Sequence, residues 1–313
     1  MITVELPALD GRQPLGFLAA LGLLRVLAQE RDIPARLSFS ATSATALLHS
    51  PLESPEQIAA VLAEVVAGIE APAVLPGVPA GFPPTAGIGK DPLRWPREDY
   101  RACAEQLKET HPRAARLWLP CLTTDLAIDS QGRGAISPFL APAGKQNSRT
   151  FFEKPLQAVQ ANPGHLLEAL VRWRRVEGFT GEYLDHHVLR SAADDSRGRT
   201  GQEAGVPGAT WLATMALPLF RLAGDGSRVR CTLWHRIAHE HIMIWPLWRP
   251  ALDLEGVRRL LEHPASRPID DAPTVSTTAW EPLGVIAAYG ARRHRIPGRT
   301  FDGVLTPTSL HTR

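Results

Sequence analysis

Residues 11–27 read Gly-Arg-Gln-Pro-Leu-Gly-Phe-Leu-Ala-Ala-Leu-Gly-Leu-Leu-Arg-Val-Leu and form the most informative segment of this 313-residue chain. From Pro14 to about Arg31 the pattern predicts a helix whose apolar side chains cover nearly every side, so the helix should be buried all round. Gly16 and Gly22 each cost about 1 kcal/mol of helix propensity relative to alanine. Glycines at such a cost usually mark the close approach of another backbone. The segment therefore predicts a central buried helix.

The rest of the chain indicates a mixture of strands and helices. Strands are predicted at 2–6, 37–40, 116–122, 228–234, 241–248 and 283–289, from alternating or short apolar runs. Helices are predicted from Ser54, where Gln57 would complete a capping box, and at 97–109, 163–173, 209–223 and from Asp253. We expect an α+β fold with mixed sheets and several packed helices. It would form one unit over 1–313, or two lobes of about 1–150 and 151–313.

A long loop interrupts this pattern at 71–96, where seven prolines and four glycines fall in 26 residues. No regular element survives that density of breakers. A loop of this length is either functional or disordered. Phe82, Ile88 and Trp95 indicate that it packs against the remainder of the protein.

Composition and net charge bear on whether the protein binds nucleic acid. The net charge of +2 argues against a protein that coats nucleic acid by bulk charge. The chain has only four lysines, so its positive charge is almost all arginine. The planar guanidinium fork suits phosphates and base edges, although a GC-rich genome would produce the same bias.

The cysteines and the apolar runs bear on the compartment. Cys103, Cys121 and Cys231 are far apart, which fits neither a disulfide framework nor a Cys-x-x-Cys metal site. The apolar run from Leu15 to Leu24 has ten residues, and a bilayer-spanning helix needs about 20. We therefore expect a cytoplasmic protein that does not associate with membranes.

The densest group of metal-capable side chains lies in the segment 179–187, Phe-Thr-Gly-Glu-Tyr-Leu-Asp-His-His. Carboxylates and histidines can hold a divalent ion that activates water. On a helix, Glu182 and His186 would share a face because they are four residues apart. The adjacent His186 and His187 would point apart. The alternative interpretation is a polar helix end before a Gly-rich loop. The candidate ligands are Glu182, Asp185, His186 and His187, followed by Asp194 and Asp195.

A second group of histidines is His235, His239 and His241. On one continuous strand these three would share a face, as zinc ligands can. Zinc needs a fourth group, and no candidate is near in the sequence. The alternative is a turn between two strands with exposed histidines.

Glycine-rich and arginine-rich segments are the candidates for nucleic-acid contacts. The segments 130–148 and 198–208 contain neither a P-loop nor a dinucleotide-binding fingerprint, but backbone amides in such loops can contact a phosphodiester backbone. Arginines interleaved with tryptophans at 172–175 and 245–249 could stack on bases, or the tryptophans could belong to the core. The predicted nucleic-acid-binding residues are Lys145, Arg149, Arg197, Arg199, Arg292, Arg293, Arg295 and Arg299. No catalytic serine or cysteine motif is present.

Four segments carry a resemblance to a known family. The opening segment 11–25 follows an N-terminal strand. Its Pro-Leu, Phe-Leu and Ala-Leu-Gly-Leu-Leu-Arg elements are similar to the opening of proteins encoded with type I-G (formerly I-U) CRISPR–Cas systems. The segments 179–185, 203–213 and 245–250 fit the same group. The chain resembles a smaller member, sometimes described as an extension of the system's helicase–nuclease. It is too short for the large effector subunit.

The resemblance implies a role in antiviral defence beside a crRNA-guided effector that targets foreign DNA, and it transfers no catalytic residues. Base pairing reads the sequence in such complexes, so a protein subunit mainly needs backbone contacts and shape. We expect a non-catalytic subunit or accessory factor of a prokaryotic type I system. It would bind crRNA, target DNA or other CRISPR-associated proteins and need no cofactor. The alternatives are a nuclease or hydrolase that uses a divalent metal at 182–195, and a protein–protein adaptor that docks through 71–96.

Overall fold

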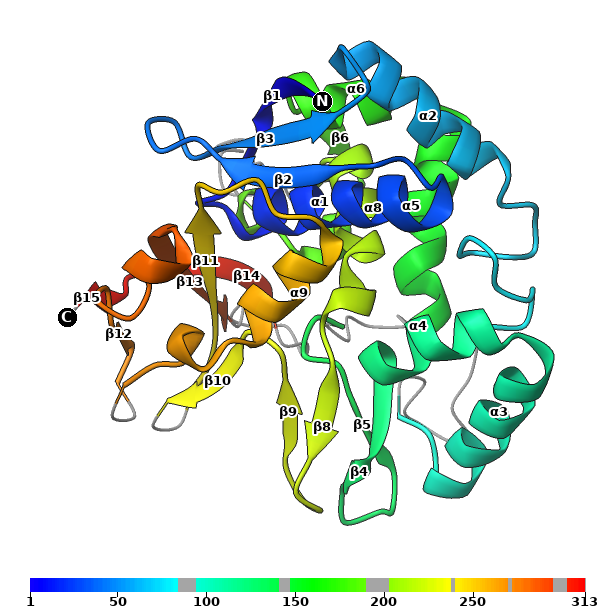
Figure 1. The fold of residues 1–313 in the computed structure, drawn as a ribbon. Coiled ribbons are helices and arrows are strands. Elements are labelled where there is room, and N and C mark those ends of the chain that lie inside the picture. Colours follow the sequence, from blue (N-terminus) through cyan, green and yellow to red (C-terminus); the bar gives the residue numbers. More distant parts are fainter. Residues whose placement is uncertain are drawn as a thin grey trace, which may run out of the picture.

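The computed structural model describes residues 1–83, 94–140, 147–189, 203–237, 240–269, 272–294 and 303–312. Its helices and its several small sheets make up an α+β fold, as the sequence predicts (Figure 1). Within these ranges no helix combines the length and apolar character needed to cross a bilayer.

Most strands pair in antiparallel fashion. In a three-stranded sheet β3 (Thr45–Ser50) lies between β1 (Ile2–Asp10) and β2 (Arg36–Phe39). A six-stranded sheet has the order β14 (Val304–Thr308), β13 (Val285–His294), β11 (Glu240–Trp248), β10 (Trp234–Ile237), β9 (Val229–Cys231) and β8 (Leu222–Gly224). Two-stranded pairs join β4 (Thr123–Ile128) to β5 (Gly134–Ile136), β6 (Val176–Glu177) to β7 (Ala204–Gly205), and, in parallel, β12 (Thr274–Val275) to β15 (His311–Thr312).

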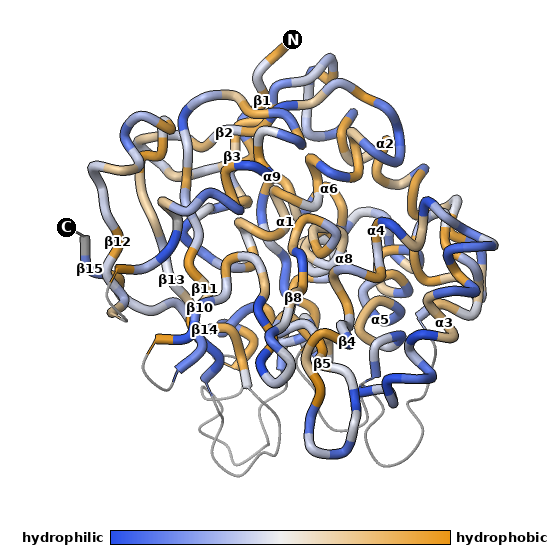
Figure 2. The backbone as a smooth tube through the Cα atoms, turned by 60° about the horizontal axis from the view of Figure 1, so that its bottom comes forward, coloured by the Kyte–Doolittle hydropathy of each residue, from blue (hydrophilic) through white to orange (hydrophobic). Residues whose placement is uncertain are grey.

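The helices cover these sheets and each other. The longer ones are α1 (Pro14–Arg25), α2 (Pro55–Ala67), α3 (Arg97–Thr110), α4 (Pro112–Leu122), α5 (Ser148–Ala161), α6 (Gly164–Val171), α8 (Pro207–Met215) and α9 (Leu254–Glu262). The 3-10 turns are η2 (Gly181–Tyr183), η3 (His186–Leu189), η4 (Leu217–Leu219), η5 (Pro264–Ser266) and η6 (Glu281–Leu283). Figure 2 shows the contrast between the hydrophilic α3 near the surface and the mostly hydrophobic α1 and α8.

The predicted central helix is confirmed. Every residue of α1 is buried, and in Figure 1 the helix runs below the three-stranded sheet with α8 beside it. A methyl group on Gly22 would overlap the carbonyl oxygen of Leu212 in α8. One on Gly16 would overlap the carbonyl oxygen of Asp10 at the end of β1. Both glycines therefore mark close backbone approach, as predicted.

The last residue of α1, Arg25, is a fully buried cation. Its Nη1 donates to Glu30 at 2.7 Å, its Nε donates to the carbonyl oxygen of Met215, and its Cζ lies 5.3 Å from the ring centroid of Trp118. Burial lowers the pKa of Arg25, and the negative charge of Glu30 opposes that shift. Glu30 is placed by a π-helical turn at 26–30, so the regular α-helix ends earlier than the predicted Arg31.

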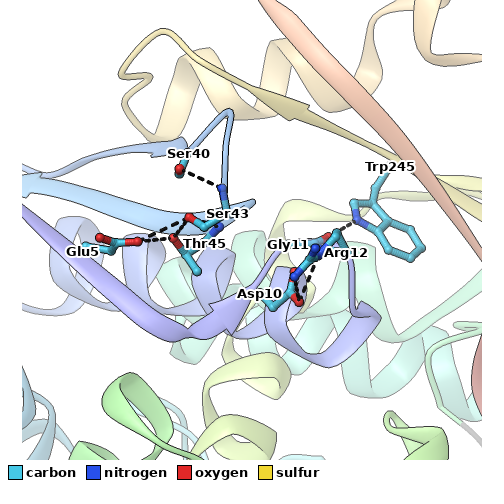
Figure 3. A network of polar contacts seen from close by, with 8 residues as sticks. All are labelled: Glu5, Asp10, Gly11, Arg12, Ser40, Ser43, Thr45 and Trp245. Carbon is cyan, nitrogen blue, oxygen red and sulfur yellow. Dashed lines mark hydrogen bonds and ion pairs between the residues drawn. The ribbon is translucent and has the colours of Figure 1, made fainter.

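The turn between β1 and α1 is fastened to the six-stranded sheet. The indole Nε1 of Trp245 donates to the carbonyl oxygen of Gly11 at 2.8 Å (Figure 3). A side chain on Gly11 would collide with Leu247 and Phe39. Trp245 and Trp248 are both fully buried, so the Trp-Pro-Leu-Trp segment belongs to the core and does not offer these rings to bases.

Polar contacts fix β1 at its C-terminal end and within the strand (Figure 3). Arg12 forms an ion pair with Asp10 at 2.8 Å and closes the turn that leads into α1. Farther back on β1, Glu5 accepts hydrogen bonds from Thr45 at 2.6 Å and from Ser43 at 3.3 Å. These contacts hold β1 against the start of β3.

The six-stranded sheet is covered on both faces. Because side chains alternate along a strand, Met243 and Trp245 of β11 enter the main core, which also contains α1. Ile242 and Ile244 pack with Trp280 in a second, smaller cluster. The sheet therefore separates two apolar layers of unequal size.

The predicted strand at 116–122 is wrong, because these residues form the C-terminal part of α4. Ala114, Ala115, Trp118, Leu119 and Leu122 recur at the three- and four-residue spacing of a helix and are all buried. Residues 116–122 alone are too few to show the helical spacing, which becomes clear only when the first turn of α4 is included.

The predicted N-cap of α2 is confirmed for Ser54, whose hydroxyl oxygen accepts a hydrogen bond from the backbone N–H of Gln57.

The loop at 71–96 carries no helix or strand in the residues that are described, which stop at 83 and resume at 94. Phe82 and Trp95 are buried, as expected for a loop that packs on the protein. Ile88 lies outside the described ranges. The guanidinium of Arg149 in α5 donates to the carbonyl oxygens of Ala80, at 2.8 Å, and Pro72. The loop is thus held to α5 through its backbone.

Replacement of Gly22 tests the contact between α1 and α8. We expect Gly22→Ala to destabilise the protein by about 1–3 kcal/mol or more, because the methyl group forces two packed backbones apart. Gly68→Ala is the matched control: its φ is −73° and an added methyl would lie 3.5 Å from its nearest neighbour, the carbonyl oxygen of Glu64. Urea unfolding of both variants gives the comparison. A Gly22→Ala protein as stable as the control would contradict the packing described.

Candidate functional site

The segment 176–189 forms a compact polar region against α8 and the edge of the six-stranded sheet. It begins in β6, which pairs with β7, and continues through η2 and η3. A side chain on Gly205 of β7 would collide with the backbone of Phe179 and Gly181. Tyr183 packs with Val304 of β14. The segment is therefore held from two sides.

The backbone of this segment is left-handed over three consecutive residues. The φ angles are 58° at Gly181, 51° at Glu182 and 57° at Tyr183. The left-handed conformation costs a non-glycine residue roughly 1–2 kcal/mol, so surrounding contacts must stabilise it. One of them is the Tyr183 hydroxyl, which donates to Glu203 at 3.2 Å. The helix on which Glu182 and His186 would share a face does not form, because two separate 3-10 turns contain these residues.

Three of the four predicted metal-capable side chains come together. One ligand atom from each of Asp185, His186 and His187 lies within 4.8 Å of the others. His187 Nδ1 is 3.0 Å and His186 Nδ1 is 3.8 Å from Asp185 Oδ1. The two imidazole centroids are 3.9 Å apart. The expectation that adjacent histidines point apart is wrong here, because they lie at the start of a 3-10 turn rather than within a regular helix or strand.

Asp185 is a buried carboxylate that other groups keep ionised. Burial alone would raise the pKa of Asp185, but hydrogen bonds from the His187 side chain and backbone and the positive charge of Arg175 lower it to about 2. Arg175 Nη2 donates to Asp185 Oδ2 at 2.7 Å, and Arg175 Nη1 donates to the carbonyl oxygen of Ala204 at 3.0 Å. The carboxylate is therefore charged across physiological pH and fixed in orientation.

Glu182 does not join this cluster. Its side chain is buried, and neither carboxyl oxygen has a hydrogen-bond partner among the residues that are described. Burial raises the pKa of Glu182 to about 8, against the opposing positive charge of Lys154. The carboxyl group is therefore mostly protonated at neutral pH, unlike that of Asp185. Asp194 and Asp195 lie outside the described residues.

The second histidine group is not assembled as predicted. His235 pairs with Ile242 and Arg236 pairs with His241 across the hairpin of β10 and β11. Directly opposed residues share a face, so His235 and His241 lie on opposite faces of the sheet. Burial, with a smaller contribution from a nearby arginine, lowers the pKa of His235 to about 4. His239 lies outside the described residues.

The predicted nucleic-acid-binding residues fall into distinct structural settings. Arg149 is buried and bound to the carbonyl oxygens of the 71–83 segment. Arg292 is exposed and forms an ion pair with Glu240 at 2.8 Å. Arg293 is bound to backbone carbonyls, as described next. The others lie outside the described residues: Lys145, Arg197, Arg199, Arg295 and Arg299.

Arg293 gathers three separate parts of the chain. Its guanidinium donates to the carbonyl oxygens of Phe139 at 2.7 Å, Tyr183 at 3.0 Å and Gly303 at 3.2 Å. Phe139 and Tyr183 precede the segments 141–146 and 190–202, and Gly303 follows 295–302. One side chain thereby joins residues 139, 183 and 303, which are far apart in the sequence.

Arg175 is a site residue that the sequence did not identify. It stands in the run 172–175, whose arginines were grouped with tryptophans as base-stacking candidates. Nothing in the run distinguishes Arg175 from Arg174, which pairs with Glu168 at 3.4 Å. The pairing of Arg175 with Asp185 depends on the tertiary turn through 176–185.

Comparison with known proteins adds no assignment. A scan against protein-family models finds no model that matches the chain, and a search of curated proteins finds no significant match.

The pH dependence of stability tests the environment of Glu182. Its pKa rises from 4.5 in the unfolded chain to about 8 in the folded one, so between these values the unfolded state gives up its proton first and stability falls as pH rises. We expect Glu182→Gln to be more stable than wild type by on the order of 2–4 kcal/mol near pH 8.5 and equally stable near pH 4.

Denaturant unfolding at both pH values measures this difference. Glu177→Gln, at an exposed position of β6, is the control and should behave as wild type at both. A stability difference between Glu182→Gln and wild type that is the same at both pH values would show that the carboxyl is not held protonated.

Proposed function

We propose that the chain is a non-catalytic subunit or accessory factor of a type I-G CRISPR–Cas system that binds crRNA, target DNA or an effector protein. The sequence resemblance is the basis for proposing a type I-G CRISPR–Cas system. Five of the basic residues predicted from the sequence to contact phosphates supply the candidate binding surface. The function of the protein in this proposal is to hold a nucleic-acid backbone rather than to read bases.

The single observation that supports the proposal is the set of hydrogen bonds from Arg293 to Phe139, Tyr183 and Gly303. Five of the predicted phosphate-binding residues lie near these three residues in the sequence. Phosphate contacts from arginine and lysine position a protein on nucleic acid without specifying sequence. These five residues are Lys145, Arg197, Arg199, Arg295 and Arg299.

The packing of the four segments that carry the resemblance fits an architectural role rather than a reactive centre. Segment 11–25 contacts 203–213 at Gly22 and 245–250 at Gly11. Segment 203–213 in turn contacts 179–185 at Gly205. Each of these contacts uses a glycine of segment 11–25 or 203–213, which explains why these two motifs contain several glycines.

A salt titration of nucleic-acid binding tests the proposal. We expect the purified protein to bind single-stranded RNA or DNA at low salt. The double variants Arg197→Gln/Arg199→Gln and Arg295→Gln/Arg299→Gln should each bind more weakly on all sequences. Removal of one phosphate contact flattens the dependence of log K on log salt by about 0.7 for a single strand.

The control removes the same charge from arginines that are already paired. Arg97 and Arg101 of α3 both contact Asp125, at 3.5 and 2.6 Å, so Arg97→Gln/Arg101→Gln should keep the wild-type salt dependence. Absence of binding to single- or double-stranded nucleic acid at low salt would reject nucleic-acid binding and leave a protein partner. Equal salt dependence in all three double variants would reject the proposed surface.

A further inference from the structure

We propose that Asp185, His186 and His187 form a binding site for one divalent transition-metal ion of the zinc type, with a fourth coordination position open. This inference does not depend on the proposed function, because it rests on the side chains at 185–187 alone and is tested without nucleic acid.

The distances between the ligand atoms fit the ion. Zinc binds imidazole nitrogen and carboxylate oxygen at about 2.0–2.2 Å in tetrahedral geometry, which places neighbouring ligand atoms about 3.4 Å apart. Asp185 Oδ1 is 3.0 Å from His187 Nδ1 and 3.8 Å from His186 Nδ1, so the two observed distances lie on either side of that value. Small rotations of the two rings would bring all three atoms to one ion.

Hydrogen bonding accounts for only part of this arrangement. Asp185 Oδ1 accepts from the backbone N–H of His187 at 2.9 Å and forms a hydrogen bond of 3.0 Å with His187 Nδ1, which a bound ion would replace. Asp185 Oδ2 accepts from Arg175 at 2.7 Å. The 3.8 Å separation from His186 Nδ1 is too long for a hydrogen bond. The His186 ring is nonetheless held against the His187 ring at a centroid distance of 3.9 Å. One ligand atom from each of the three side chains therefore already lies within 4.8 Å of the other two.

The groups around the cluster meet the requirements of a metal site. Arg175 fixes the orientation of the carboxylate through Oδ2 and leaves Oδ1 on the side of the histidines, as outer-sphere partners do for metal ligands. The side chains of His186 and His187 are 19% and 28% exposed. Both rings are therefore partly exposed to solvent, whereas the His186 Nδ1 atom itself is buried.

The donor set selects the kind of ion. Two imidazole nitrogens with one carboxylate oxygen suit zinc and neighbouring first-row ions such as cobalt, whereas magnesium and calcium prefer oxygen ligands. Three protein ligands with an open position are typical of a site where the ion contacts a further ligand.

Metal titration of the full-length chain, first stripped with a chelator, tests the site. We expect one zinc ion per chain, a rise in Tm on zinc addition, and a visible absorption band with cobalt typical of tetrahedral coordination. His186→Ala and His187→Ala should each weaken zinc binding by more than about tenfold, since loss of even an outer-sphere partner costs about 10- to 100-fold. Both side chains are partly exposed, so we expect these variants to fold.

The double variant His235→Ala/His241→Ala removes two imidazoles from β10 and β11 and is the matched control. It should bind zinc as wild type does. The proposal is overturned if wild type binds no stoichiometric zinc or cobalt. It is equally overturned if His186→Ala/His187→Ala, folded by circular dichroism, retains wild-type affinity, or if the control double variant loses affinity to the same extent.

Discussion

The fold depends on direct contact between the backbones of α1 and α8, which only a glycine at position 22 allows. With no side chain there, α8 lies close enough to cover α1 while the three-stranded sheet covers another side, and α1 becomes an internal helix. Gly11 plays the same role at the turn before α1, where it receives Trp245. Helix, sheet and turn are thus positioned by places where a side chain is missing. The position of the polar region at 176–189 depends on this arrangement, because its backbone packs against Gly205, which lies just before α8.

Helices with strong local sequence signals could be predicted from the sequence. Helices and strands whose type depends on tertiary packing could not. The buried helix and the helix capped at Ser54 combine several signals that agree, and both are present. The strand predicted at 116–122 is wrong, and no strand or helix was predicted for β3 or α5. Segment 116–122 is too short to separate a helical from an extended period. The central strand β3 is rich in alanine and leucine, and α5 contains an internal Pro155. In each, local preference opposes or leaves open what packing finally selects.

The candidate site illustrates the same limit at the level of single side chains. The sequence identified Asp185 and both histidines by residue type, but the relative directions of the histidines follow from the 3-10 turn that begins at His186, which the sequence did not predict. Burial likewise divides residues of one type into different chemical roles. Glu182 is driven toward its neutral form while Asp185, three residues away, stays ionised. Arg149 and Arg293 direct their guanidinium groups to backbone carbonyls, so charge alone does not mark a binding surface.

The wide sequence separation of the contacts around α1 has a consequence for the newly made chain. Arg25 binds Met215, which is made 190 residues later, and Gly11 binds Trp245, which is made 234 residues later. At about 5–20 residues per second on the ribosome, the helix emerges roughly 10–50 seconds before its covering partners exist. Throughout that interval the side of α1 that packs against α8 in the finished protein has no partner from its own chain. Synthesis of this protein therefore creates a defined period in which chaperones, or a co-translated partner, have a surface to bind that the finished molecule no longer presents.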